Sequence, residues 1–253
     1  MFPASFIPKA HLILAVLFLF CGCGRHPQTV PTTISHDTAQ ASHSQIDTFN
    51  IDSPTEATMR TMGLVDIQEI DSTIHVSLMY ATADNFMKKV LYPDIRKAFV
   101  LPELAEKLAN AQKQLQAIHP GYSLIIYDAA RPLHVQREMW ETAQTMGMTK
   151  YVANPLKRNG LHNYAAAVDI SIVDENGTPL SMGTPIDWFG PESHTTDEAQ
   201  LVADGKITEQ ELANRMLLRK IMKSNGMLTI RSEWWHFEMM RAKQAKATLK
   251  IIE

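Results

Sequence analysis

Two short segments in the second half of the chain combine imidazole and carboxylate side chains. The first reads GLHNYAAAVD and carries His162 and Asp169; the second reads SEWWH and carries Glu233 and His236. A catalytic zinc ion takes three protein ligands and leaves one position open, so two histidines and one carboxylate form an adequate set. These residues therefore indicate a zinc site made by His162, Asp169 and His236. Glu233 would then be the general base, because a carboxylate outside the ligand set can accept a proton from water.

The spacing within each segment predicts where the chain must turn. His162 and Asp169 are an odd number of positions apart, so on one regular strand their side chains would face opposite sides. We therefore expect His162 in a loop before a strand and Asp169 on that strand. The same reasoning places Glu233 in a loop that precedes His236.

The elements that must position these residues can be read from apolar periodicity. Alternation predicts strands at 65–70 and 74–78, and β-rich runs predict further strands at 122–127, 166–173 and within 227–239. Helical spacing runs from Leu101 to Leu115, and Thr208 with Glu211 forms a capping box for another helix. Because these elements do not alternate regularly, we predict an α+β single domain with a mainly antiparallel central sheet flanked by helices.

Composition excludes several classes of function. The chain has 253 residues, a formal net charge of -3 and a sequence pI near 6.4, so it lacks the basic surface that nucleic acid requires. We therefore expect no nucleic-acid partner. Its two cysteines, Cys21 and Cys23, lie together near the N-terminus. No thiolate is thus available downstream, and any metal site there must use His, Asp and Glu.

The N-terminal segment is typical of an exported protein. An apolar run from Leu12 to Phe20 has the length of a signal-peptide core, and Gly22-Cys23 resembles a bacterial lipoprotein cleavage site. We predict a signal peptide at 1–23, a disordered Ser/Thr-rich tether at 24–62 and the folded domain at 63–253. The expected location is the periplasm or cell envelope, with a lipid anchor at Cys23 as the only membrane contact.

The residues around the predicted site resemble a known family, the D-alanyl-D-alanine dipeptidases. The family pattern Ser-x-His-x-x-Gly-x-Ala-x-Asp is matched by His162, Ala167 and Asp169, and its Glu-x-x-His pattern by EWWH. The segments YATADNF and YDAARP are similar to further signatures, and the resemblance covers residues 64–241. In two departures from the pattern, Gly160 stands in place of the serine and Ala165 in place of the glycine.

The resemblance implies a fold shared with the Hedgehog signalling domain, one zinc ion per chain and hydrolysis of D-Ala-D-Ala in cell-wall dipeptide turnover. It also implies that Arg131 stabilises the oxyanion of the tetrahedral intermediate, a task that suits a fixed guanidinium. Asp187, and with it Tyr80, would hold the free amino group of the dipeptide. A carboxylate is the simplest counter-charge for an ammonium, which agrees with the role given to Asp187.

Several alternatives remain open at this point. The same metal motifs serve D,D- and L,D-carboxypeptidases that act on peptidoglycan stem peptides and need a longer cleft. A third hypothesis is a non-catalytic, metal-bound binding module, against which the retention of Glu233 and Arg131 argues. Taken alone, Arg131 is equally an ion-pairing residue at a strand-to-helix turn, and Asp187 is equally a turn residue after Pro185.

Overall fold

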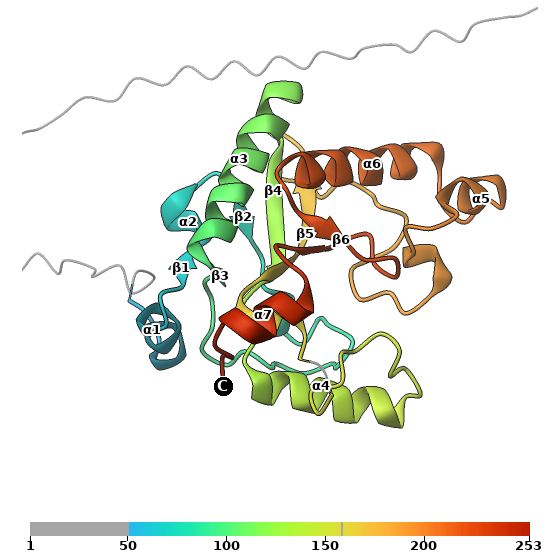
Figure 1. Ribbon diagram of the computed structural model, residues 1–253. Helices are drawn as coiled ribbons and strands as arrows, with labels where there is room; N and C mark the ends of the chain where they lie inside the picture. The colour runs from blue at the N-terminus through green and yellow to red at the C-terminus, as the bar shows by residue number, and fades with distance from the viewer. Residues whose placement is uncertain (1–50, 158) are drawn as a thin grey trace, which may run out of the picture. The chain divides into compact units, whose positions relative to one another are not determined.

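The centre of the molecule is a five-stranded mixed sheet in the order β2-β4-β5-β7-β6 (Figure 1). This computed structural model describes residues 51–157 and 159–253, which belong to one compact unit. Within the sheet only the β2–β4 pair is parallel, and the other three pairs are antiparallel. The prediction of an α+β domain with a mainly antiparallel sheet is therefore confirmed.

The described elements follow one another without regular alternation. The strands are β1 (Val65–Asp66), β2 (His75–Val76), β3 (Phe99–Val100), β4 (Ser123–Asp128), β5 (Ala167–Val173), β6 (Leu228–Thr229) and β7 (His236–Glu238). The α-helices are α1 (Pro54–Thr61), α2 (Ile67–Ile70), α3 (Pro102–Ile118), α4 (Leu133–Thr145), α5 (Glu198–Ala203), α6 (Glu209–Ser224) and α7 (Ala242–Thr248). Short 3-10 turns are η2 (Met79–Ala81), η3 (Leu161–Tyr164) and η4 (Pro191–Ser193).

One face of the sheet is apolar and forms the core with the long helices. Alternate residues of a strand project to opposite faces, and paired residues on neighbouring strands share a face. The apolar row comprises Leu124, Ile126, Val168, Ile170, Ile172 and Phe237, all almost completely buried. Helices α3 and α6 pack against each other on this side, α3 along β4 and α6 against β6 (Figure 1). The predicted capping box of α6 is present, with Thr208 and Glu211 bonded reciprocally.

The opposite face carries the buried polar residues of β5. Asp169 and Ser171 alternate with the apolar residues of β5, and both are buried. Helix α4 follows the C-terminal end of β4, and η3 precedes the N-terminal end of β5. Residues that are far apart in the sequence therefore meet where β4 ends and β5 begins.

Two sequence predictions are corrected by the structure. Residues 65–70 form a short strand followed by the helical turn α2, because the Asp66 side chain accepts a hydrogen bond from the Gln68 backbone and so begins a helix. The predicted tether, 24–62, overlaps α1, whose residue Met59 is fully buried in the core. The folded domain thus begins before residue 63. The predicted signal peptide, Cys23 and the first part of the tether lie outside the described residues.

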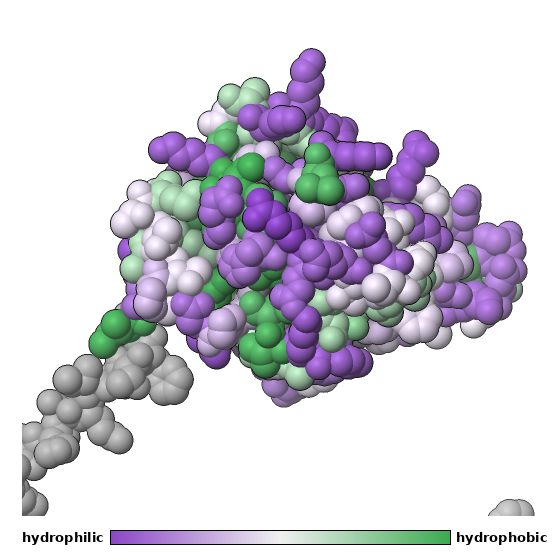
Figure 2. Space-filling model, turned by 90° about the horizontal axis from the view of Figure 1, so that it is seen from below, coloured by the Kyte–Doolittle hydropathy of each residue, from purple (hydrophilic) through white to green (hydrophobic). Residues whose placement is uncertain are grey.

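Hydrophilic residues dominate the surface seen in Figure 2, with smaller apolar areas between them. Large exposed apolar side chains include Leu156, at 85% exposure, and Ile51, at 67%. Among the helices that the structure describes, none has the length and apolar character needed to cross a membrane.

Candidate active site

A row of polar residues crosses three neighbouring strands at one end of the sheet. Asp169 of β5 lies opposite Asp128 of β4 on one side and opposite His236 of β7 on the other. All three residues are buried, and Asp128 is completely so. Because paired residues share a face, the sheet register itself brings the Asp169 carboxylate to the His236 imidazole.

His162 reaches this row from the 3-10 turn η3, which confirms its predicted place in a loop before the strand. The turn ends at Ala165, whose φ of 52° lies in the left-handed region. That conformation costs a residue with a side chain about 1–2 kcal/mol relative to right-handed backbone, which explains a glycine there in the family pattern. The His162 Nδ1–H donates to the Ala129 carbonyl at 2.9 Å, so Nε2 faces the row with its lone pair.

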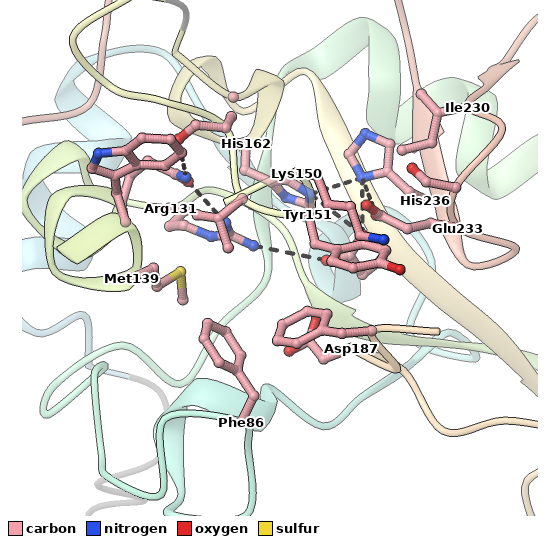
Figure 3. Close-up of a pocket in the computed structure, with 18 of the residues that line it drawn as sticks. Phe86, Arg131, Met139, Lys150, Tyr151, His162, Asp187, Ile230, Glu233 and His236 are labelled. Atoms are coloured by element: carbon pink, nitrogen blue, oxygen red, sulfur yellow. Dashed lines mark hydrogen bonds and ion pairs between the residues drawn. The ribbon is translucent and has the colours of Figure 1, made fainter. Parts of the chain in front are cut away.

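The three predicted ligand atoms form a compact triangle, and Figure 3 shows two of its members, His162 and His236, side by side. His162 Nε2 lies 3.2 Å from His236 Nδ1, which lies 3.0 Å from Asp169 Oδ1, and the third side is 3.4 Å. Tetrahedral bonds of about 2.0–2.1 Å place ligand atoms roughly 3.3–3.4 Å apart, so the triangle fits one zinc ion. The second nitrogen of His236 lies 3.6 Å from Glu238, which can orient the ring.

The charge state of Asp169 suits a metal ligand. Burial alone would raise its pKa, but the imidazoles of His162 and His236 hold the pKa of Asp169 well below its usual range. The carboxylate is therefore ionised at neutral pH. A cation at this position would meet an anionic oxygen and two nitrogen donors, which is the set expected of an open zinc site.

Glu233 lies beside the triangle without being part of it. Glu233 Oε2 is 3.9 Å from His236 Nδ1. As the sequence predicts, Glu233 lies in the loop that precedes β7. Burial raises the pKa of Glu233 to about 7, with the neighbouring His236 opposing that rise. A pKa near neutrality suits a group that must accept a proton and later return it.

Arg131 is held rigidly at the edge of the site by two residues. Its Nε donates to Asp128 Oδ2 at 2.9 Å, and its Nη1 donates to Gln136 Oε1 at 2.9 Å. Burial would lower the pKa of Arg131, but the Asp128 carboxylate keeps it well above the usual value. Its Nη2 lies 3.8 Å from Asp169 Oδ2, so the guanidinium is turned toward the triangle.

Asp187, in a loop, and Tyr80, in η2, both line the pocket and contact each other. The Tyr80 hydroxyl donates to Asp187 Oδ2 at 2.7 Å. Burial, together with Asp169, raises the pKa of Asp187 to about 7. Asp187 also has a φ of 61°, a left-handed conformation that aspartate adopts more readily than most residues.

All seven predicted site residues line one cavity of about 360 Å³ (Figure 3). Its volume is in the range of small-molecule sites. Gly160 lines it too, and so does the consecutive segment 149–154. A second cavity, of about 860 Å³, adjoins the first, since Phe86 and Asp187 line both.

Two residues with clear structural connections to the site, Asp128 and Gln136, were not predicted from the sequence. Asp128 binds Arg131, accepts a 2.6 Å hydrogen bond from the Tyr92 hydroxyl and lies 3.4 Å from His162. Gln136 connects Arg131 to the Ala153 carbonyl. The signal for Asp128 was present, because an aspartate three residues before an arginine at a strand end can fold back onto it. No sequence signal pointed to Gln136, because the group that it bonds, the Ala153 carbonyl, lies in a loop without a motif.

A buried triad of two histidines and one carboxylate, beside a glutamate with a raised pKa, defines the class of a metal-dependent hydrolase. Comparisons with known proteins give the family. The model of the peptidase M15 family, described as D-ala-D-ala dipeptidase, matches residues 60–252. This chain therefore belongs to the D-ala-D-ala dipeptidase family and is a metallopeptidase, which confirms the resemblance drawn from its motifs.

Curated relatives agree with that assignment. The chain is 31% identical over 185 residues to a D-alanyl-D-alanine dipeptidase of Escherichia coli (strain K12), covering 72% of this chain and 87% of the relative. It is 27% identical over 195 residues to a protein of the same name from Enterococcus faecalis, covering 70% and 92%. A third such relative, from Synechocystis, is 29% identical over 161 residues, covering 52% and 65%.

Proposed function

We propose that the chain hydrolyses the dipeptide D-Ala-D-Ala with one zinc ion held by His162, Asp169 and His236. The observation that carries this proposal is the triangle of ligand atoms, which has the dimensions of a zinc site and has Glu233 beside it. The names of the curated relatives support the choice of substrate. A zinc ion there would supply Lewis-acid polarisation of the peptide carbonyl and would acidify water.

In this mechanism Glu233 accepts the proton of the attacking water and returns it to the leaving amino group. Burial of Glu233 supports this role, because it brings the pKa of the carboxyl close to neutrality. Arg131 stabilises the negative charge that develops on the carbonyl oxygen. Its guanidinium is already fixed by Asp128 and Gln136, so little reorganisation accompanies the reaction.

Asp187 and Tyr80 form the subsite for the free ammonium of the dipeptide. The Asp187 side chain lines the metal-site cavity, is partly buried and accepts a hydrogen bond from the Tyr80 hydroxyl, so a cation beside it would meet less water than at an open surface. Because Asp187 lines both cavities, it stands where a peptide extended at its amino end would have to pass. This position favours the dipeptide over longer substrates.

The experiment that tests this function is an assay of the purified protein on D-Ala-D-Ala with metal control. We expect hydrolysis that disappears after chelation and returns when one equivalent of zinc per chain is added. N-acetyl-D-Ala-D-Ala and a stem pentapeptide serve as comparison substrates. Equal efficiency on the pentapeptide would favour the carboxypeptidase alternative, and zinc binding without hydrolysis of any of the three would favour a binding module.

The cellular setting is a proposal of its own, based on the sequence. The apolar run that ends before Cys21 and the Gly22-Cys23 pair support export, cleavage before Cys23 and diacylation of that cysteine. An envelope location fits turnover of dipeptide released from cell wall. Mass spectrometry of the mature N-terminus tests the anchor, and a product that begins elsewhere with no lipid would contradict it.

A further inference from the structure

The proposed substrate carries two opposite charges, and the roles given so far provide for only one. Asp187 neutralises the ammonium, while the carboxylate at the other end of the dipeptide needs a cation. Apart from the two histidines of the metal triad, the cationic side chains that line the cavity among the described residues are Arg131 and Lys150. These two are therefore the candidate counter-charges for a substrate carboxylate that binds in this cavity.

Arg131 is already engaged. Its guanidinium has Asp128 as counter-charge, bonded through both Nε and Nη2, and its remaining nitrogen Nη1 donates to Gln136. Asp128 is completely buried, so this pair cannot separate without leaving a charge unpaired in the interior. Arg131 thus stays with the reacting carbonyl and is not free to follow a second group.

Lys150 has the opposite properties. It is exposed, and no carboxylate pairs with its ammonium in the described part of the chain. The ammonium lies over the ring of Tyr151, 4.7 Å from the ring centre. In Figure 3 the Lys150 side chain extends toward Glu233 and His236, while Asp187 lies on the opposite side of Tyr151. A dipeptide with its ammonium at Asp187 would thus present its other end toward Lys150.

The segment that carries Lys150 is fixed at two points. The Tyr151 ring stacks on Phe189 with a centroid distance of 5.2 Å and an interplanar angle of 19°. Two residues further on, the Ala153 carbonyl accepts a 2.9 Å hydrogen bond from Gln136 Nε2. The lysine stem therefore projects from a held backbone across a held aromatic face, which limits the positions that its ammonium can take.

We propose that Lys150 binds the C-terminal carboxylate of the substrate and so makes the site selective for a free carboxyl end. This inference rests on the proposed function and adds a residue that would bind the carboxylate of the dipeptide. Gly160, which also lines the cavity, has no side chain to share this task.

The test compares D-Ala-D-Ala with D-alanyl-D-alaninamide, whose carboxyl end is neutral, in four proteins. These are the wild type, Lys150→Met, Lys150→Arg and the matched control Lys157→Met, an exposed lysine that lines a different cavity. We expect kcat/KM of Lys150→Met to fall about 10- to 100-fold on the free acid, as for loss of a hydrogen bond to a charged group, and to change little on the amide. Lys150→Arg should retain most of the preference.

The ratio of the two efficiencies decides the matter. A collapsed ratio in Lys150→Met with a preserved ratio in Lys157→Met supports the assignment. An unchanged ratio in Lys150→Met, or an equal collapse in both variants, would overturn it while leaving the dipeptidase function standing. A wild type that cuts neither substrate would instead contradict the proposed function, and this inference with it.

Discussion

The Tyr80 hydroxyl donates a 2.7 Å hydrogen bond to the Asp187 carboxylate, although the two residues are 107 positions apart in the sequence. We predict that Asp187→Asn, which keeps the shape and removes the charge, lowers kcat/KM on D-Ala-D-Ala by a hundredfold to several thousandfold. The reason is that removing one partner of a buried ion pair costs about 3–5 kcal/mol, and each 1.36 kcal/mol is tenfold. Steady-state kinetics on the dipeptide and on its N-acetyl form measure this.

Acetylation removes the ammonium, so Asp187→Asn should affect the N-acetyl dipeptide far less than the free one. Tyr80→Phe is the companion variant, because it removes the hydrogen bond and leaves the charge of Asp187 in place. Its loss on the free dipeptide should be smaller than that of Asp187→Asn. If Asp187→Asn lowered kcat/KM equally on the free and the N-acetyl dipeptide, Asp187 would not be the residue that binds the free ammonium.

A second prediction concerns Asp128, which holds Arg131 from a fully buried position. Asp128→Asn should lower the free energy of unfolding by about 3–5 kcal/mol, because the buried guanidinium loses its counter-charge. It should also lower kcat, since Arg131 is no longer fixed toward Asp169. Urea unfolding and steady-state kinetics provide the two measurements.

The control for Asp128 is Glu103→Gln, which removes an exposed carboxylate 3.6 Å from Lys107 on α3. Exposed pairs contribute only about 0–1 kcal/mol, so this variant should unfold almost as the wild type does. If Asp128→Asn were as stable and as active as Glu103→Gln, the proposal that Asp128 holds Arg131 in place would be contradicted.

The third prediction tests the departure from the family pattern at Gly160. A Cβ there would lie 3.6–3.7 Å from its nearest neighbours, Gln136, Ala153 and Asn163, which is ordinary contact distance. The buried Oδ1 of Asn163 has no hydrogen-bond partner in the described part of the chain. Gly160→Ser should therefore be accommodated and raise the free energy of unfolding by about 1 kcal/mol through a new hydrogen bond to that oxygen.

Gly183→Ser gives the contrast for the same chemical change. Its Cβ would come within 2.5 Å of Ile207, and its φ of 82° disfavours any side chain. Thermal unfolding should rank Gly160→Ser at or above the wild type and Gly183→Ser clearly below it. A marked destabilisation by Gly160→Ser would mean that the pocket wall at this position is closed to a side chain.

Sequence reasoning could single out the candidate metal triad, which the structure brings together, because its members lie in two short segments with recognisable residue types. The turn between His162 and Asp169 followed from strand geometry alone, and η3 has that turn. The class of the fold followed from the irregular order of elements. The strand predicted at 65–70 was wrong, since Ile67 and Ile70 fit helical spacing as well as alternation and the side chain of Asp66 decides between them.

Other features depend on contacts that the sequence does not encode locally. The start of the domain was placed too late because α1 is polar over much of its length, and its burial of Met59 against the core is a tertiary property. Gln136 becomes part of the site only because α4 brings it between Arg131 and the Ala153 carbonyl. Lys150 was overlooked for a similar reason, since its loop has no motif.

The most direct test of the proposed roles of Glu233 and His236 is a parallel measurement of bound zinc and of turnover in Glu233→Gln and His236→Ala. We predict that Glu233→Gln keeps one zinc per chain and loses hydrolysis of D-Ala-D-Ala, because the amide cannot accept a proton while the ligand triangle is intact. His236→Ala should lose both, because one of three ligands is gone. Loss of zinc from Glu233→Gln, or near-normal turnover by this variant, would contradict the role of Glu233 as a general base outside the ligand set.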